Sequence, residues 1–297
     1  MFAFTPGNVF WPYFAGVLIL LIGLFASSKE VSRARGKEKL LILARVFFAV
    51  PMAVFASQHF TTTKFVSQLI PSWIPARVFW TYFVGTALLA AALSIVVKKQ
   101  ARLAATLLGT MLILFELVLH IPHIIGHPRD VLMWAVAFRD LAFSGGALAF
   151  AATQPERRRA EGQSALVPVA RIFVSVPTIF FGVAHFLHPE FLPAVDIDQR
   201  TPTWIPAHSL WAYGAGAVFI VLGTTMLLNR KTRLAATYLG LVVLVLLAFV
   251  YLPMVIAKPS DIDNSLNYFV STLAFSGVAF LLASAIPAGN PPEIRHP

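Results

Sequence analysis

Nine apolar segments, each long enough to cross a lipid bilayer as a helix, constrain the fold of this chain more than any other feature. A transmembrane helix needs about 20 residues that are mostly apolar. Only 12% of the 297 residues are charged, too few to cover a water-facing surface, since soluble domains carry about 25%. The segments are residues 8–27, 40–60, 78–97, 103–122, 131–153, 169–187, 209–228, 234–254 and 265–286. The sequence therefore predicts an all-α integral membrane protein with nine transmembrane helices.

Lys and Arg side chains are concentrated in alternate connections between these segments, and this pattern predicts the orientation of the chain. The basic clusters are at 29–39, 98–102, 157–159 and 230–233. Because cytoplasmic loops carry the excess of Lys and Arg, we expect the N-terminus outside and the C-terminus in the cytoplasm, in a bacterial cytoplasmic (inner) membrane. A secretory signal would require Lys or Arg before its apolar segment, and none precedes the first segment here. We therefore expect this segment to be retained as a helix.

Charge and cysteine content exclude several classes of function. The formal net charge of +10 follows from the basic clusters, which would also attract anionic membrane lipid. No basic segment is interleaved with aromatic side chains, so nucleic acid is not an expected partner. The absence of cysteine excludes disulfides and thiolate chemistry by this chain. Without glycine-rich phosphate loops or catalytic triads, ATP-driven transport and dehydrogenase chemistry are not expected either.

The chain contains an internal duplication. Arg45 and His59 recur in the second half as Arg171 and His185. The peptides WIPA at 73–76 and RLAAT at 102–106 recur in the same register at 204–207 and 233–237. We therefore expect an N-terminal helix and basic loop at 1–39, a first four-helix repeat at 40–153, a cytoplasmic linker at 154–168, a second four-helix repeat at 169–286 and a cytoplasmic tail at 287–297. An even number of segments in each unit predicts parallel bundles related by an axis along the membrane normal.

The repeated residues resemble the DoxX-like membrane proteins. The features that carry the resemblance are Gly182, His185-Phe186, Pro189-Glu190-Phe191, Pro202 and Trp204-Ile205-Pro206 in the second copy, and His59-Phe60 and Trp73-Ile74-Pro75 in the first, where Ala56 replaces the glycine. The resemblance covers about residues 40–153 and 169–286. It implies the four-helix fold of each repeat and a role linked to quinone or oxidative stress, since the family includes the small subunit of thiosulfate:quinone oxidoreductase. Distant relatives with this bundle act in cargo export or receptor assembly.

Ionisable side chains inside the predicted segments are the candidates for function, because charge within a membrane is costly. Glu116, His120 and His123 are spaced i, i+4 and i+7, which predicts one narrow stripe on an α-helix. Arg139 and Asp140 lie at a similar depth in the next segment, so we expect Arg139 within about 4 Å of Glu116 or Asp140. His59 ends the second segment on the same outer side and is added to this set. The candidate ligand-binding residues are therefore His59, Glu116, His120, His123, Arg139 and Asp140.

The second repeat provides an internal comparison for this cluster. Its counterparts of Glu116, His120, Arg139 and Asp140 are Leu247, Tyr251, Ser271 and Thr272, and only His59 keeps its counterpart, His185. Charges needed merely to hold the bundle together should occur in both copies. We therefore expect the first copy to hold the site and the second to be scaffold. Prolines inside the segments, at 51, 122, 177 and 253, are expected to kink their helices.

Two functions from different classes fit these observations. The first is a membrane subunit that binds a lipophilic redox molecule, with a quinone implied by the resemblance, at the outer-leaflet cluster and alongside a redox partner subunit. His120, Glu116 and Arg139 would then supply a donor or proton carrier for the carbonyl groups. The alternative is a non-enzymatic scaffold or assembly protein whose cluster docks a partner. A structural ion pair without chemistry, and a metal ion or haem held by the histidines, are further alternatives, and whether the protein is itself an enzyme stays open.

Overall fold

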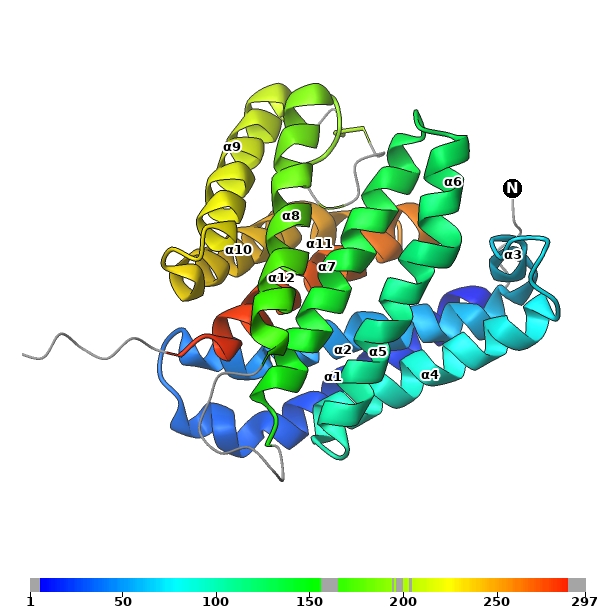
Figure 1. Cartoon of the computed structure of the whole chain (residues 1–297), viewed down its shortest axis with the longest axis horizontal. Coiled ribbons are helices and arrows are strands. Elements are labelled where there is room, and N and C mark those ends of the chain that lie inside the picture. Colours follow the sequence, from blue (N-terminus) through cyan, green and yellow to red (C-terminus); the bar gives the residue numbers. More distant parts are fainter. Residues whose placement is uncertain (1–5, 156–164, 194, 196–199, 203–204, 288–297) are drawn as a thin grey trace, which may run out of the picture.

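The chain folds into long helices that pack side by side (Figure 1). A computed structural model describes residues 6–155, 165–193, 195, 200–202 and 205–287. The elements in chain order are α1 (Pro6–Arg33), α2 (Glu38–Thr61), α3 (Thr63–Gln68), α4 (Arg77–Val97), α5 (Ala101–Phe115), η1 (Glu116–His120), α6 (Ile121–Gly126), α7 (Val131–Thr153), α8 (Leu166–Leu187), α9 (His208–Leu227), α10 (Thr232–Leu246), η2 (Leu247–Tyr251), α11 (Leu252–Ala257), η3 (Ile262–Leu266) and α12 (Asn267–Ala285). The three η elements are π-helical turns.

Nine helices within the described residues are long and apolar enough to cross a membrane, as predicted. They are α1, α2, α4, the continuous α5–η1–α6, α7, α8, α9, the continuous α10–η2–α11, and η3–α12. Large apolar side chains cover their outer surface: Phe25 is 84% exposed, Ile125 76% and Phe249 73%. Such a surface is unfavourable in water and suits hydrocarbon, which indicates a multi-pass membrane protein.

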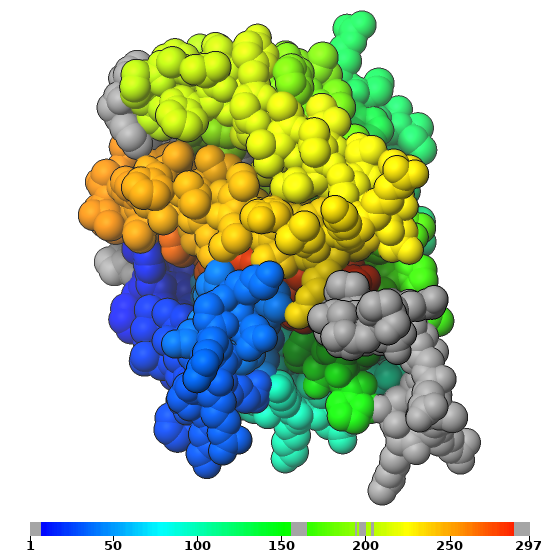
Figure 2. Space-filling model, turned by 90° about the vertical axis from the view of Figure 1, so that its left-hand side faces the viewer, coloured from blue at the N-terminus to red at the C-terminus, as the bar shows by residue number. Residues whose placement is uncertain are grey.

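The connections between helices gather at two opposite ends of the molecule. The connections after α1, α4 and α9, which contain Lys and Arg, lie toward the lower left of Figure 1, whereas α3, α6 and the start of α1 lie toward the upper right. Figure 2 shows the left-hand side, with the blue N-terminal segment next to yellow and orange helices from the second half. The basic cluster at 157–159 and nearly all of the tail at 287–297 lie outside the described residues.

Each half packs its last helix against the first helix of the other half. Within the halves, α2 packs on α4, α5 on α7, α8 on α9 and α10 on α12. Between them, α7 packs on α8, α12 on α2, and α7 on α12. Glycines permit the close contacts: a Cβ on Gly145 would lie 3.0 Å from the Ala170 carbonyl oxygen, and one on Gly277 would lie 3.1 Å from that of Ala44. Both glycines end the peptide LAFSG, at 141–145 and 273–277.

Two of the π-helical turns occur at corresponding positions because a proline follows each. In η1 the Ile121 N–H binds the Glu116 carbonyl, and in η2 the Leu252 N–H binds the Leu247 carbonyl. Pro122 or Pro253 comes next in the chain. Proline has no N–H and its ring clashes with the carbonyl four residues earlier. Widening the preceding turn relieves that clash while the helix continues.

The third π-helical turn, η3, accounts for one extra residue in the second half. Asp130 and Asp261 are as far apart in the sequence as the two WIPA peptides are. Each aspartate accepts a hydrogen bond from the backbone N–H three residues later. Farther along, Ser144 and Ser276 are separated by one residue more, yet their hydroxyls donate equivalently to the carbonyls of Gly109 and Gly240, at 2.9 and 3.1 Å. A π-helical turn holds one residue more than an α-helical turn, so η3 restores the packing register.

Candidate functional site

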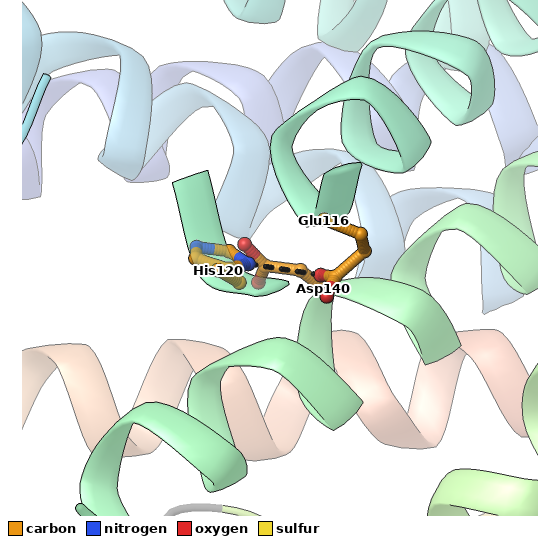
Figure 3. A group of neighbouring side chains, drawn as sticks. All are labelled: Glu116, His120 and Asp140. Carbon is orange, nitrogen blue, oxygen red and sulfur yellow. Dashed lines mark hydrogen bonds and ion pairs between the residues drawn. The ribbon is translucent and has the colours of Figure 1, made fainter. Parts of the chain in front are cut away.

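The centre of the candidate site lies between η1 and α7 and joins Glu116, His120 and Asp140 (Figure 3). The Nδ1 atom of His120 lies 3.0 Å from Oε1 of Glu116, the interaction drawn as a dashed line. Glu116 is 9% exposed and His120 8%. One ligand atom from each of the three side chains lies within 4.8 Å of the others. When Glu116 is ionised, its carboxylate only accepts hydrogen bonds, so Nδ1 of His120 donates to it.

Arg139 forms the expected ion pair, and its partner is Asp140. The Nε atom of Arg139 lies 3.1 Å from Oδ1 of Asp140, and both side chains are mostly buried. The guanidinium also lies over two aromatic rings, 6.0 Å from the centre of Phe55 on α2 and 5.8 Å from that of Phe143. Such cation–π contacts help to hold a cation in an apolar environment. Arg139 is therefore positioned by α2 and α7 together.

The charges of the cluster determine its proton content. We use the name proton cluster for Glu116, His120, Arg139 and Asp140. With both carboxylates ionised, the guanidinium charged and the imidazole neutral, the proton cluster carries one negative charge. Binding of a single proton makes it neutral, and a neutral cluster is the less costly form in a low-dielectric environment. The net charge of the proton cluster therefore favours one additional proton beside these side chains.

His123 does not continue the stripe of Glu116 and His120. The π-helical turn spans Glu116 to His120 and adds a residue, so the spacing of 100° per residue that predicted the stripe does not hold between Glu116 and His123. Instead, Nε2 of His123 lies 3.0 Å from Oδ2 of Asp130, and both side chains are more than one-third exposed. His127 stacks on His123 with ring centres 4.6 Å apart. The structure thus places His123 in a separate group with Asp130 and His127, which we call the outer group after the side expected from the sequence.

Asp130 caps the N-terminus of α7, outside the membrane-spanning helices. Its Oδ1 accepts a hydrogen bond of 3.0 Å from the Met133 N–H. This backbone hydrogen bond, together with the one to His123, lowers the pKa of Asp130 below its ordinary value. The outer group therefore carries a fixed negative charge beside two histidines.

His59 takes part in packing that both halves share. Its Nδ1 lies 2.8 Å from the Phe55 carbonyl oxygen one turn earlier; a carbonyl only accepts, so Nδ1 carries the proton. A Cβ on Gly85 of α4 would lie 2.7 Å from the Cβ of His59. In the second half, His185 binds the Phe181 carbonyl in the same way. Among the described residues, Glu116, His120 and Asp140 bring potential ligand atoms close together, and His59 is not part of this group.

A hollow of about 470 Å³ adjoins η1 on the side of α3 and α4. Its lining includes Trp73, Arg77, Leu119, Pro122 and His123. The sequence had not marked Arg77 as part of a site. The signal was present, because Arg77 directly follows the repeated WIPA peptide, whereas the second copy has His208 at that position.

The second half has the same local backbone at the corresponding place but neutral side chains. Tyr251, Ser271 and Thr272 are buried, each no more than 1% exposed. Since η2 matches η1, the π-helical turn belongs to the repeat and does not depend on the charges. The ionisable side chains are what distinguish the first half.

Glu116, His120 and Asp140 together include the donor types that a metal ion would need, one imidazole and two carboxylates. The permanent positive charge of Arg139, however, already lies beside Asp140, with 3.1 Å between Nε and Oδ1. That charge opposes a metal cation at the same carboxylate. The donor set therefore suits a proton better than a metal ion.

Comparison with known proteins yields one partial match. A family model described as a domain of unknown function, DUF8561, matches residues 48–127. The matched range lies in the first half, runs from α2 into the connection after α6, and contains Glu116 and His120 but neither Arg139 nor Asp140. Searches of curated proteins and of solved structures find no match.

Proposed function

We propose that the protein is a membrane subunit that binds a lipophilic redox molecule of the quinone type at the outer end of its first half. The observation that carries this proposal is the proton cluster, which occurs in only one of two halves with matching local structure. A cluster that can exchange one proton is what a ligand needs when its reduction or oxidation involves protons. The resemblance to DoxX-like proteins supports a quinone and a redox partner subunit.

The proposal includes an orientation in the bacterial cytoplasmic membrane. The N-terminus would be outside and the C-terminus in the cytoplasm, because the basic connections lie together at one end of the molecule. The two halves would be parallel repeats about an axis near the membrane normal. The equivalent contacts of Gly145 with α8 and Gly277 with α2 support this relation. In this orientation the proton cluster and the hollow lie toward the outer leaflet.

The hollow next to η1 is large enough to accommodate a quinone ring. Its volume of about 470 Å³ is within the usual range for small-ligand sites, about 300–1,000 Å³. Trp73, Leu119 and Pro122 provide apolar walls, and Arg77 and His123 provide hydrogen-bond donors for carbonyl oxygens. A bound quinone would supply the redox chemistry. The protein would bind and orient the ring at the hollow and hold a proton on the Glu116–His120 pair.

The second half suggests the variant that tests this function. Replacing the proton cluster by its counterparts (Glu116→Leu, His120→Tyr, Arg139→Ser and Asp140→Thr) introduces side chains that the repeat already accommodates. We expect the variant to fold with near-normal thermal stability and to bind a short-chain quinone roughly tenfold more weakly, a loss of about 1.4 kcal/mol. Quenching of tryptophan fluorescence in reconstituted protein measures this binding.

A matched variant separates the hollow from the proton cluster. Arg77→His, the residue of the second half, should also weaken quinone binding, because an imidazole is shorter than a guanidinium and offers fewer N–H donors. The change does not touch the proton cluster. Unchanged binding by a folded quadruple variant would remove the proton cluster from the function. Lack of quinone binding by the unmodified protein, together with a stoichiometric protein partner on purification, would favour the scaffold alternative.

A further inference from the structure

The helix α1 stands outside the repeat and covers one face of the first half. It packs on α2 and also contacts α4. Two of its glycines fit against valines of α2: a Cβ on Gly16 would lie 2.8 Å from Val54 Cγ2, and one on Gly23 would lie 2.9 Å from Val46 Cγ1. The glycines are seven residues apart, a spacing that keeps them on nearly the same side of a helix.

A carboxylate continues this stripe at the inner end of α1. Glu30 comes seven residues after Gly23, and its Oε2 lies 3.0 Å from Nη1 of Arg45. Arg45 is 4% exposed, and its Nη2 also lies 3.0 Å from the Ser27 hydroxyl. Lys98 on the end of α4 lies 3.0 Å from the same carboxylate. Helix α1 therefore presents two small residues to the first half and then an acid that neutralises a buried arginine.

Among the described residues, no helix covers the corresponding face of the second half, which we call the open face. Gly23 touches Val46 and Val96, both 0% exposed. The counterpart of Val46 is Ile172 on α8, because each directly follows the repeated arginine, Arg45 or Arg171. The counterpart of Val96 is Leu227 on α9, because each lies the same distance before the repeated RLAAT peptide. Ile172 is 43% exposed and Leu227 is half-buried. Within the described elements, α8 packs on α7, α9 and α12. No described helix takes the place there that α1 takes in the first half.

Arg171 corresponds to Arg45 but pairs differently. Its Nη1 donates to the carbonyl oxygens of Met226 and Leu227, at 3.2 and 2.8 Å, in the last turn of α9. No carboxylate of the described residues pairs with it. This face thus also ends at a cation, and in the described part of the chain no acid neutralises it as Glu30 neutralises Arg45.

We propose that this face of α8 and α9 binds a transmembrane helix of a partner protein that presents small residues seven apart and a carboxylate seven residues farther toward its inner end. The intramolecular contact of α1 shows which helix chemistry the equivalent face accepts. Small residues allow the close backbone approach that drives helix association in lipid. Charge complementarity with Arg171 favours a helix over an acyl chain. The inference does not depend on the quinone proposal.

A peptide with the sequence of α1 is the direct probe, and the absence of native cysteine makes disulfide trapping specific. The full-length protein with Ile172→Cys is reconstituted with a synthetic peptide of residues 6–33 carrying Gly23→Cys, and a mild oxidant is added. We expect a one-to-one adduct. The same peptide with Glu30→Gln should give roughly fivefold less adduct, because an ion pair with Arg171 is lost.

Two controls define specificity. A peptide with cysteine at Phe25 instead of Gly23 places the thiol on the opposite side of the helix and should give little adduct. The protein with Val46→Cys, at the matching position covered by its own α1, should also give little.

Three outcomes would overturn the proposal. Equal yields from the Gly23→Cys and Phe25→Cys peptides, or from the peptides with and without Glu30→Gln, would show that the contact is not specific. No adduct at all would show a face that meets only lipid. A disulfide-linked protein dimer formed without peptide would identify a second copy of the chain as the occupant.

Discussion

At the scale of single residues, the pairing of Arg139 with Asp140 explains how two charges persist inside a membrane helix. The two side chains are 18% and 14% exposed, respectively. Phe55 and Phe143 cover the guanidinium. Removing one partner leaves a charge without compensation, which costs more than removing both.

We predict that Arg139→Gln lowers the free energy of unfolding by about 3 kcal/mol, because Asp140 is left as a mostly buried carboxylate without its cation. The double change Arg139→Gln with Asp140→Asn should recover most of that loss. Unfolding of reconstituted protein by titration with a denaturing detergent measures both. If the double variant were as unstable as the single one, charge compensation would not be the role of the pair.

At the scale of helices, glycines set how closely α8 and α9 approach. A Cβ on Gly216 would lie 2.8 Å from the Gly182 carbonyl oxygen, and one on Gly182 would lie 2.9 Å from that of Gly216. Backbone atoms cannot move aside as a flexible side chain can. Gly214, two residues earlier on α9, has nothing within 4 Å of its Cβ position.

We therefore predict that Gly216→Ala and Gly214→Ala have opposite effects. Gly216→Ala should destabilise the protein by about 1–3 kcal/mol through overpacking. Gly214→Ala should be neutral or stabilise it by up to about 1 kcal/mol, because alanine favours a helix. Thermal unfolding of the two variants side by side tests this. Equal destabilisation would mean that general helix distortion, and not contact with Gly182, is responsible.

At the scale of the whole molecule, one end carries the basic connections and the other carries the outer group and the hollow. The arrangement follows from successive antiparallel crossings along the described part of the chain, since each long helix returns the chain to the opposite end. In the proposed orientation, the end that carries the basic connections lies in the cytoplasm.

We predict that reporter fusions at Lys37, Gln100 and Lys231 read cytoplasmic, whereas a fusion at Lys258 reads external. The first three positions lie in the basic connections, and Lys258 follows α11 at the other end. The cytoplasmic fusion expected at Arg158 tests a segment outside the described residues. An external signal from any of the first three would contradict the proposed orientation.

The nine helices could be predicted because the signal for each is local: an apolar run of sufficient length is enough. The pairing of Arg139 with Asp140 was also foreseeable, since a permanent cation in hydrocarbon needs a nearby acid. The position of His123 was not. Its predicted place assumed regular α-helical spacing, and Pro122 changes that spacing by favouring η1. The sequence signal for the altered spacing was Pro122 itself, which recurs at the matching position as Pro253.

By itself, the amino-acid sequence determined the number of helices, the duplication and the set of ionisable residues within apolar segments, because each depends on residue type and spacing along the chain. Only the tertiary structure decided that α7 packs on α8 and α12 on α2, and that His59 packs against α4 while His120 faces Asp140. It also decided that no described helix covers α8 and α9 as α1 covers the first half. These contacts join residues far apart in the chain, and many pairings of apolar helices bury similar area. The choice between them depends on the close fit of particular side chains, such as Gly277 against the backbone of α2.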